Sequence, residues 1–142
     1  MADETLIEFA LPGTTLHSMK ITLQTGPGVN LVRSFVPGEL RVGDDVIHSS
    51  CLLTAGSIDT AWPPQTLSEL TLDHLEAVVS GQPEIVLIGS GTKQRFPERS
   101  LISRLLSRRI GVEVMDTAAA CRTFNILVSE DRRVVAALFL KD

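Results

Sequence analysis

The pattern between residues 84 and 115 constrains the fold of this chain more than any other feature. The run "EIVLI" (84–88) is continuously apolar, which is typical of a strand buried on both faces of a sheet. Pro97 suits the first turn of a helix that continues to about residue 109, and "VEVM" (112–115) indicates the next strand. A right-handed crossover makes these two strands parallel. The chain is therefore predicted to be an α/β protein that contains a βαβ unit in its second half.

The segments around this unit predict a mixed sheet, rich in β-strands at the front of the chain and parallel at the back. An Ala-rich helix follows residue 117, and "RRVVAALFL" (132–140) indicates a final strand. Periodicity and turn residues predict further elements: strands at 18–24, 31–36 and within 40–54, a hairpin turn at 43–45, and a helix around 72–79. A chain of 142 residues is expected to form one domain, here assigned to 17–142 after a loose lead-in at 1–16.

The start of the chain and the cysteines indicate a cytoplasmic protein. The opening "MADETLIEFALPG" is acidic and interrupted by Glu8 and Pro12, unlike a signal or transit peptide. No run approaches the roughly 20 apolar residues of a transmembrane helix. Cys51 and Cys121 stand apart from any metal-ligand spacing, so no metal is expected. They are interpreted as free thiols in a reducing cytosol, although a single disulfide stays open.

Charge is distributed unevenly along the chain. The net charge is −4, which argues against nucleic-acid binding, yet the window 93–109 carries +5. A helix in this window would turn Leu101, Ile102, Leu105 and Leu106 inward and Arg99 and Arg104 outward. Two interpretations remain open: a solvated crossover helix, or a docking surface for an acidic partner.

Two apolar residues extend the candidate docking surface. Trp62, the only tryptophan, lies in a proline-bound loop, where it could cover the core or anchor a partner. Ile126 joins Ala119 in a small apolar strip on the last helix, opposite its buried face. The predicted partner patch therefore consists of Trp62, Arg99, Arg104 and Ile126.

The corner where "VEVM" meets the last helix concentrates polar residues. Cys121 shares the apolar stripe of this helix with Phe124, which favours a buried core cysteine over a nucleophile. Arg122 and Asn125 share another stripe. Arg122 either pairs with Asp116 as a structural clasp or helps to hold an external anion.

The loop after "EIVLI" leaves the same edge of the sheet as this corner. In open α/β sheets, ligands bind in the crevice outside the carboxyl ends of parallel strands. The loop lacks a dinucleotide or P-loop fingerprint, so a tight structural turn is an equally open interpretation. The candidate ligand site comprises Gly89, Ser90, Gly91, Thr92, Gln94, Arg95, Asp116, Thr117, Cys121, Arg122 and Asn125.

Three motifs together resemble a known family: "PEIVLIGSGTKQRFP", "RRIGVEVMDTAAACRTFNILVSEDRRVVAALF" and "SSCLL" with its following "AW". The chain is similar over about residues 17–140 to the domain-of-unknown-function 498/598 family, which is shared by bacteria, archaea and mitochondria. The resemblance implies a compact three-layer domain around a mixed sheet, with no established enzymatic activity or cofactor. Family members include a mitochondrial assembly factor of respiratory complex I and an adipogenesis-associated protein, and this chain looks like a cytosolic bacterial version.

Two functions are therefore expected from the sequence. The leading hypothesis is a non-catalytic interaction module that helps a larger complex to assemble and that uses a protein partner. The alternative is a protein or enzyme that binds a small anion in the crevice at the carboxyl ends of strands 84–88 and 112–115. No cofactor and no catalytic residues are assigned.

Overall fold

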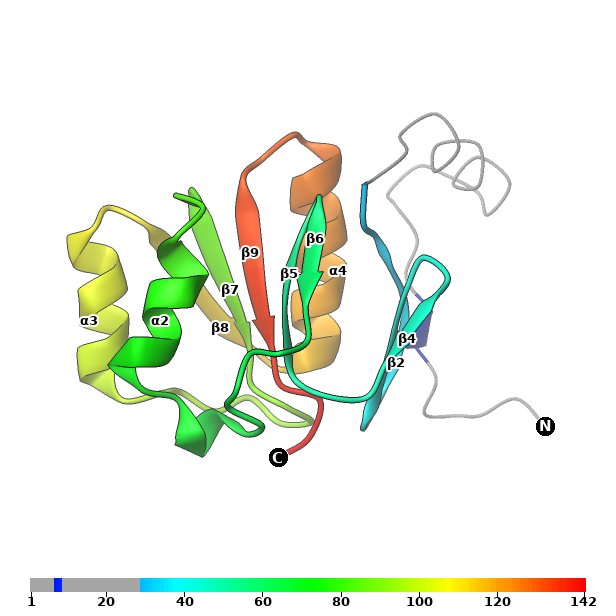
Figure 1. The fold of residues 1–142 in the computed structure, drawn as a ribbon, viewed down its shortest axis with the longest axis horizontal. Coiled ribbons are helices and arrows are strands. Elements are labelled where there is room, and N and C mark those ends of the chain that lie inside the picture. Colours follow the sequence, from blue (N-terminus) through cyan, green and yellow to red (C-terminus); the bar gives the residue numbers. More distant parts are fainter. Residues whose placement is uncertain (1–6, 9–28) are drawn as a thin grey trace.

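The computed structural model describes residues 7–8 and 29–142, which form two β-sheets with three α-helices (Figure 1). The predicted lead-in at 1–16, apart from Ile7–Glu8, and the predicted strand at 18–24 lie outside the described residues. The α/β class and the mixed sheet are confirmed. No helix within 7–8 and 29–142 combines the length and the apolar character needed to cross a membrane.

The larger sheet contains the predicted βαβ unit. Its five strands lie in the order β6-β5-β9-β7-β8, and their bounds are β5 Cys51–Thr54, β6 Ser57–Asp59, β7 Ile85–Gly89, β8 Gly111–Met115 and β9 Val134–Leu138. Strand β7 pairs in parallel with β8 on one side and with β9 on the other, whereas β5 runs antiparallel to β9 and β6. The predicted mixed sheet therefore changes from parallel to antiparallel pairing between β9 and β5.

The front strands form a second, fully antiparallel sheet. Its strands are β1 Ile7–Glu8, β2 Val32–Val36, β3 Glu39–Val42 and β4 Asp45–Ile47, paired in this order. Gly43 adopts φ +56° in the predicted hairpin turn between β3 and β4. The segment 40–54, expected to be rich in strands, is divided between the two sheets. The chain crosses over at His48–Ser50, where the buried Ser50 hydroxyl donates a hydrogen bond to the carbonyl of Pro64.

Helices cover both faces of the five-stranded sheet. Helices α2 (Leu72–Val79) and α3 (Arg99–Ser107) lie on one face, and α4 (Thr117–Ser129) lies on the other, between this sheet and the four-stranded sheet (Figure 1). Alternating side chains divide accordingly: Val86 and Ile88 of β7 join the α2/α3 core, whereas Leu87 joins the α4 core. Burial on both faces of the sheet thus explains why the sequence of β7 is continuously apolar.

The buried face of α3 is narrower than predicted. Leu101 and Leu105 are buried, but Leu106, which was expected to point inward, is 54% exposed. Helix α3 packs against β8, the edge strand of the sheet, so only one row of its side chains has a partner below it.

Each helix of the α/β unit is followed within three residues by a non-glycine residue in the left-handed conformation. These residues are Gln82 after α2, Arg109 after α3 and Asp131 after α4, with φ of 52°, 61° and 60°. At α3 the amide of Arg109 donates to the carbonyl of Leu106 (2.9 Å), and that of Ile110 donates to Leu105 (3.4 Å). This is the Schellman motif, whose left-handed position favours glycine. A residue with a Cβ there costs about 1 kcal/mol.

Candidate functional site

The structure brings the loop after β7 against the first residues of α4, as the sequence predicts. The amide of Thr117 donates to the carbonyl of Gly91 (2.9 Å), and the amide of Gly91 donates to the Thr117 hydroxyl oxygen (2.9 Å). The Thr117 hydroxyl in turn donates to the carbonyl of Phe139 (2.6 Å). Because Thr117 is fully buried, these bonds join three segments of the chain and leave its hydroxyl turned away from solvent.

Ser90 closes the loop on itself. Its hydroxyl donates to the carbonyl of Lys93 (2.7 Å) and accepts from the amide of Arg95 (3.0 Å), while its own amide donates to Met115 (2.9 Å). The Gln94 side-chain amide donates to the carbonyl of Val114 (3.1 Å). These contacts favour the tight structural turn over a loop with amides free to hold an anion.

The two glycines of the loop are required by close packing. A Cβ on Gly89 would lie 3.0 Å from both the Leu138 Cδ2 and the Thr117 Oγ1 atoms. Gly91 has φ +115°, and a Cβ there would collide with the carboxylate of Asp142. Both glycines therefore have a structural role that needs no ligand.

The carboxylate of Asp142 accepts hydrogen bonds from both donors of Thr92. The Thr92 amide donates to Asp142 Oδ1 (2.9 Å), and the Thr92 hydroxyl donates to Asp142 Oδ2. These bonds, with smaller contributions from Arg95 and Lys93, hold the pKa of the Asp142 carboxyl below its usual value. A neighbouring pocket of about 320 Å³ is lined by Ser90, Arg95, Phe96, Glu98 and Asp142 among others. Arg95 therefore shares this pocket with two carboxylates, those of Glu98 and Asp142.

Asn125 does not face this crevice. Its side chain is buried on the opposite side of α4, where Oδ1 accepts from the amide of Val32 (2.8 Å) and Nδ2 donates to the carbonyl of Val32 (2.9 Å). The carboxamide thus pairs with β2 as a neighbouring strand would. Its place in the ligand site is wrong, because the four-stranded sheet covers a face of α4 that the sequence suggested was open.

The two cysteines are free and buried in the same core. Burial raises the pKa of the Cys51 thiol to about 12, and it raises the pKa of the Cys121 thiol as well. Thiolates are the nucleophilic form of cysteine, and burial disfavours this form at both positions. The interpretation of Cys121 as a core residue is confirmed, and it does not line the crevice.

The predicted clasp between Asp116 and Arg122 is not formed. The Asp116 carboxylate caps α4 by accepting from the amide of Ala119 (2.8 Å). None of the ion pairs between described residues joins it to Arg122, which is exposed. An N-cap carboxylate satisfies a helix amide that would otherwise lack a partner, and here this role takes precedence.

The residues of the predicted partner patch do not form one surface. Trp62 is only 2% exposed, stacks on Phe139 with 5.3 Å between ring centroids, and donates from Nε1 to the carbonyl of His74 (3.2 Å). It covers the core, so its role as a docking anchor is wrong. Arg99 and Arg104 are exposed on α3, whereas Ile126 is exposed on α4, across the sheet.

A cationic pocket at the amino ends of the parallel strands was missed by the sequence analysis. About 620 Å³ in volume, it is lined by four arginines, Arg108, Arg109, Arg132 and Arg133, together with Glu84 and apolar neighbours. The arginine pairs lie in the turns before β8 and β9, so their proximity depends on the parallel pairing of these strands with β7. The two "RR" motifs at 108–109 and 132–133 were the available signal.

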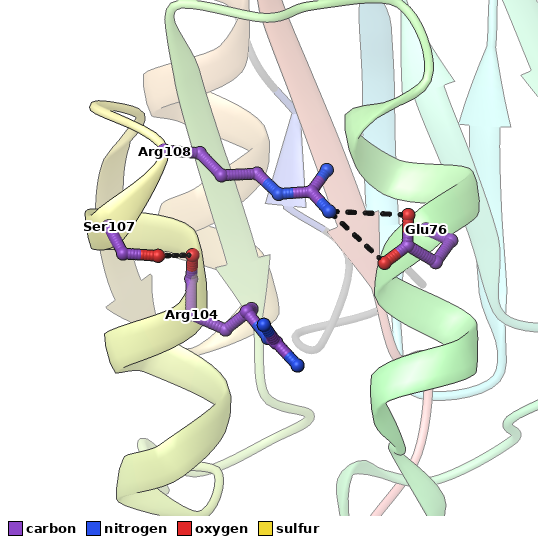
Figure 2. A network of polar contacts seen from close by, with 4 residues as sticks. All are labelled: Glu76, Arg104, Ser107 and Arg108. Carbon is purple, nitrogen blue, oxygen red and sulfur yellow. Dashed lines mark hydrogen bonds and ion pairs between the residues drawn. The ribbon is translucent and has the colours of Figure 1, made fainter.

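Two of these arginines belong to exposed ion pairs. Arg108 reaches from α3 across to Glu76 on α2 (3.3 Å), as Figure 2 shows. Arg132 Nε lies 3.4 Å from Glu84 Oε1, which also accepts from the amide of Arg133 (2.9 Å). The Arg133 hydrogen bond and both guanidinium groups lower the pKa of Glu84. The single carboxylate of the pocket is thus permanently charged at neutral pH.

The described residues offer no assembled metal site. Nowhere within 7–8 and 29–142 do three His, Cys, Asp or Glu side chains gather closely enough to hold a metal ion.

Comparison with known proteins places the chain in a family. Residues 32–139 match the family described as "Protein of unknown function (DUF498/DUF598)". The chain is 27% identical over 123 residues to a Danio rerio protein named NADH dehydrogenase (ubiquinone) 1 alpha subcomplex assembly factor 3, covering 85% of this chain and 70% of that protein. It is 35% identical over 68 residues to the "13 kDa major membrane protein" of Francisella tularensis, covering 48% of this chain and 55% of that protein.

A solved structure supports the same assignment. The crystal structure of a Bordetella parapertussis protein superposes with a TM-score of 0.74 at 34% identity, covering 81% of this chain and 98% of that one. Its likeness extends over both sequence and fold. The chain belongs to the DUF498/DUF598 protein family.

Proposed function

We propose that this protein is a non-catalytic interaction module that assists the assembly of a larger protein complex. The observation that carries the proposal is membership of a family whose relatives include a protein named as an assembly factor of NADH dehydrogenase. An assembly factor acts by binding other proteins, so an exposed docking surface is its functional feature.

The polar side chains in the crevice at the carboxyl ends of β7 and β8 bond to other parts of the chain, and this supports the proposal. The Thr117 and Ser90 hydroxyls bond to the chain's own backbone, and Asp142 takes the donors of Thr92. Both thiols are buried, with raised pKa values. Free thiols suit a reducing compartment, so the proposal places the protein in the cytoplasm.

The exposed arginines of α3 provide a docking surface in this proposal. Arg99 and Arg104 both lie on the solvent side of the helix. Exposed arginines attract an acidic surface and raise the rate of association with it. Arg104 extends from α3 towards α2, on the same side as Arg108 (Figure 2).

The test is cross-linking in the native organism, followed by purification of the tagged protein and mass spectrometry. We expect a stoichiometric protein partner, whose recovery falls when Arg99 and Arg104 are both changed to Glu and when the ionic strength is raised. Recovery of the protein without any enriched partner would contradict the interaction module.

A second candidate function is the binding of a small anion at the carboxyl ends of β7 and β8. It is favoured by Arg95, which lines the 320 Å³ pocket beside Ser90. Thermal-shift measurements with phosphate and with small dicarboxylates test it. Stabilisation that disappears in the Arg95→Ala variant would support this function, whereas equal melting temperatures with and without these anions would exclude it for them.

A further inference from the structure

A groove with a mixed apolar and polar lining lies between α2 and the β5–β6 hairpin, whose Ser57 and Asp59 supply polar groups to it. Its volume is about 470 Å³. The lining includes Leu52 of β5 and Val135 of β9 from the sheet, and Ala77 and Val78 from α2. Leu52 and Val135 are 6% and 7% exposed, so they lie deep in the structure.

The groove leads directly into the cationic pocket. Pro83, Arg132 and Arg133 line both cavities. Beyond them, Arg108 and Arg109 line the far side of the cationic pocket, around Glu84. A groove with apolar residues at its floor and a cluster of four guanidinium groups are therefore continuous on the surface of a protein whose net charge is −4.

The arginines of the pocket are available to an external anion. The pairs Arg108–Glu76 and Arg132–Glu84 are solvent-exposed, and such pairs contribute little stability, so they exchange readily. The Arg133 Nε atom donates to the carbonyl of Gln82 (3.3 Å), an exposed contact. Within the described part of the chain, the guanidinium of Arg109 makes no hydrogen bond or ion pair.

The backbone of Arg109 shares the left-handed conformation of Gln82 and Asp131 after the other two helices. It adopts φ +61° at a helix end where glycine is the favoured residue. An arginine there destabilises the turn, and no hydrogen bond or ion pair of its side chain with described residues offsets this. Its exposed guanidinium can therefore pair with an external carboxylate.

We propose that the groove and the cationic pocket together bind an acidic segment of a protein partner, with an apolar side chain of that segment in the groove and its carboxylates on Arg109, Arg132 and Arg133. Guanidinium groups pair with carboxylates through two parallel hydrogen bonds, and a buried apolar anchor supplies affinity. This inference rests on the proposed function and adds a second docking surface to the one on α3.

The shape of the site favours a peptide segment over a membrane surface. A bilayer is broad and cannot reach Leu52 and Val135 at the floor of a groove, whereas a single side chain can. A lone phosphate or carboxylate also fits poorly, since the arginines lie in two separate turns, before β8 and before β9. An extended segment with several carboxylates spans both turns.

A random dodecapeptide display library panned against the full chain tests the proposal. We expect the selected peptides to be rich in Asp and Glu next to a large apolar residue. Their affinity, measured by fluorescence anisotropy, should fall about tenfold or more in the double variant Arg109→Glu/Arg133→Glu and in Ala77→Trp, which fills the groove. Raising the salt concentration should weaken binding to the wild type.

Matched controls separate the site from general charge and bulk. The variant Arg33→Glu/Arg41→Glu carries the same change in charge on exposed positions of the four-stranded sheet, and Ser103→Trp adds similar bulk on exposed α3; neither should alter peptide affinity more than about twofold. Melting temperatures verify folding. If Arg109→Glu/Arg133→Glu does not fold, Arg109→Gly/Arg133→Gln replaces it, because glycine suits the left-handed position.

Several outcomes would overturn the inference. These are a library that yields no binders, binders without acidic residues, and binders unaffected by Arg109→Glu/Arg133→Glu. Arginine-dependent binding to phosphatidylglycerol vesicles without any selected peptide would also overturn it, by assigning the surface to membranes. Failure of this inference can be told apart from failure of the proposed function. A native partner whose binding is insensitive to these variants refutes this docking surface alone. Selected peptides without any native partner refute the assembly role alone.

Discussion

The two ends of the parallel strands β7, β8 and β9 have opposite characters. At the carboxyl ends, where α/β proteins usually bind ligands, hydroxyls, amides and a carboxylate bond to one another. At the amino ends, four arginines gather around one glutamate in a pocket of about 620 Å³. The position of a crevice follows from topology, but its availability depends on whether the chain has already used the donors there.

The backbone shows the same difference. At the carboxyl ends, Gly89 and Gly91 allow segments to approach too closely for a side chain. At the amino ends, Gln82, Arg109 and Asp131 occupy left-handed positions that glycine would fill at lower cost. Substitutions at the carboxyl ends are therefore expected to lower the stability of the protein. Substitutions to glycine at the amino ends are expected to raise it.

The largest effect is expected from Thr117→Val at the carboxyl ends. Valine has nearly the shape of threonine but leaves the buried amide of Gly91 and the carbonyl of Phe139 without their hydroxyl partner. Each unsatisfied buried group costs about 1–3 kcal/mol, so the free energy of unfolding should fall by about 3 kcal/mol. Urea denaturation measures this loss.

Thr117→Ser is the matched control, because serine keeps the hydroxyl and should cost much less. A loss below about 1 kcal/mol for Thr117→Val would mean that these hydrogen bonds do not hold the carboxyl end together, and it would weaken the contrast between the two ends.

Gly91→Ala should cost somewhat less, about 2 kcal/mol, because it combines strain at φ +115° with displacement of the Asp142 side chain. The lost contact is the pair of hydrogen bonds from Thr92, so the melting temperature reports both effects. Gly56→Ala is the control: no atom lies within 4 Å of its added Cβ, and it should be neutral or slightly stabilising. Equal effects at Gly91 and Gly56 would contradict the close packing of the loop.

Arg109→Gly should have the opposite sign at the amino ends. Glycine relieves the left-handed strain after α3, and the free energy of unfolding should rise by about 1 kcal/mol. Arg109→Ala removes the same side chain but keeps the Cβ, so it should give no such gain. If both variants are destabilised, the side chain of Arg109 contributes to the fold and the amino end is not a strained surface.

Most of the fold was predictable from local sequence patterns. The bounds of β7, β8, α2, α3 and β9 agree with the predicted ones to within about two residues at each end. Apolar runs buried on both faces and local signals such as Pro97 define these elements. The separation of the front strands into a second sheet was not predictable. That sheet forms through contacts between β2 and α4, residues far apart in the sequence, of which the Asn125–Val32 pair is an example.

The sequence predicted where the candidate site lies, but not whether its hydrogen-bond donors are free. Gly89, Gly91 and Thr117 do lie together, since strand direction and turn residues determine where the loops meet. Whether their donors are free depends on Asp142 and Phe139, which reach the loop only through the folded chain. Likewise, two "RR" motifs gave no sign that they share one pocket until β7 was placed between their strands.

The smallest effect is expected from the two carboxylates that mark the ends, Asp142 and Glu84. Both have pKa values below the ordinary value of about 4, Asp142 chiefly through hydrogen bonds from Thr92 and Glu84 chiefly through the amide of Arg133. A carboxyl with a lower pKa in the folded state stabilises the protein above the unfolded pKa, and this contribution disappears as the pH falls through the folded pKa. The melting temperature should therefore fall below about pH 4, and less so in Asp142→Asn and Glu84→Gln.

Salt should distinguish the two carboxylates. The guanidinium groups of Arg132 and Arg133 also act on Glu84 through space, and dissolved ions screen such exposed interactions. The effect of Glu84→Gln on the acid limb of the melting curve should thus shrink at high salt, while that of Asp142→Asn, which depends on hydrogen bonds from Thr92, should change less. Equal salt dependence would show that both ends are governed by the same long-range electrostatics, and that the arginines of the amino end create no distinct local field.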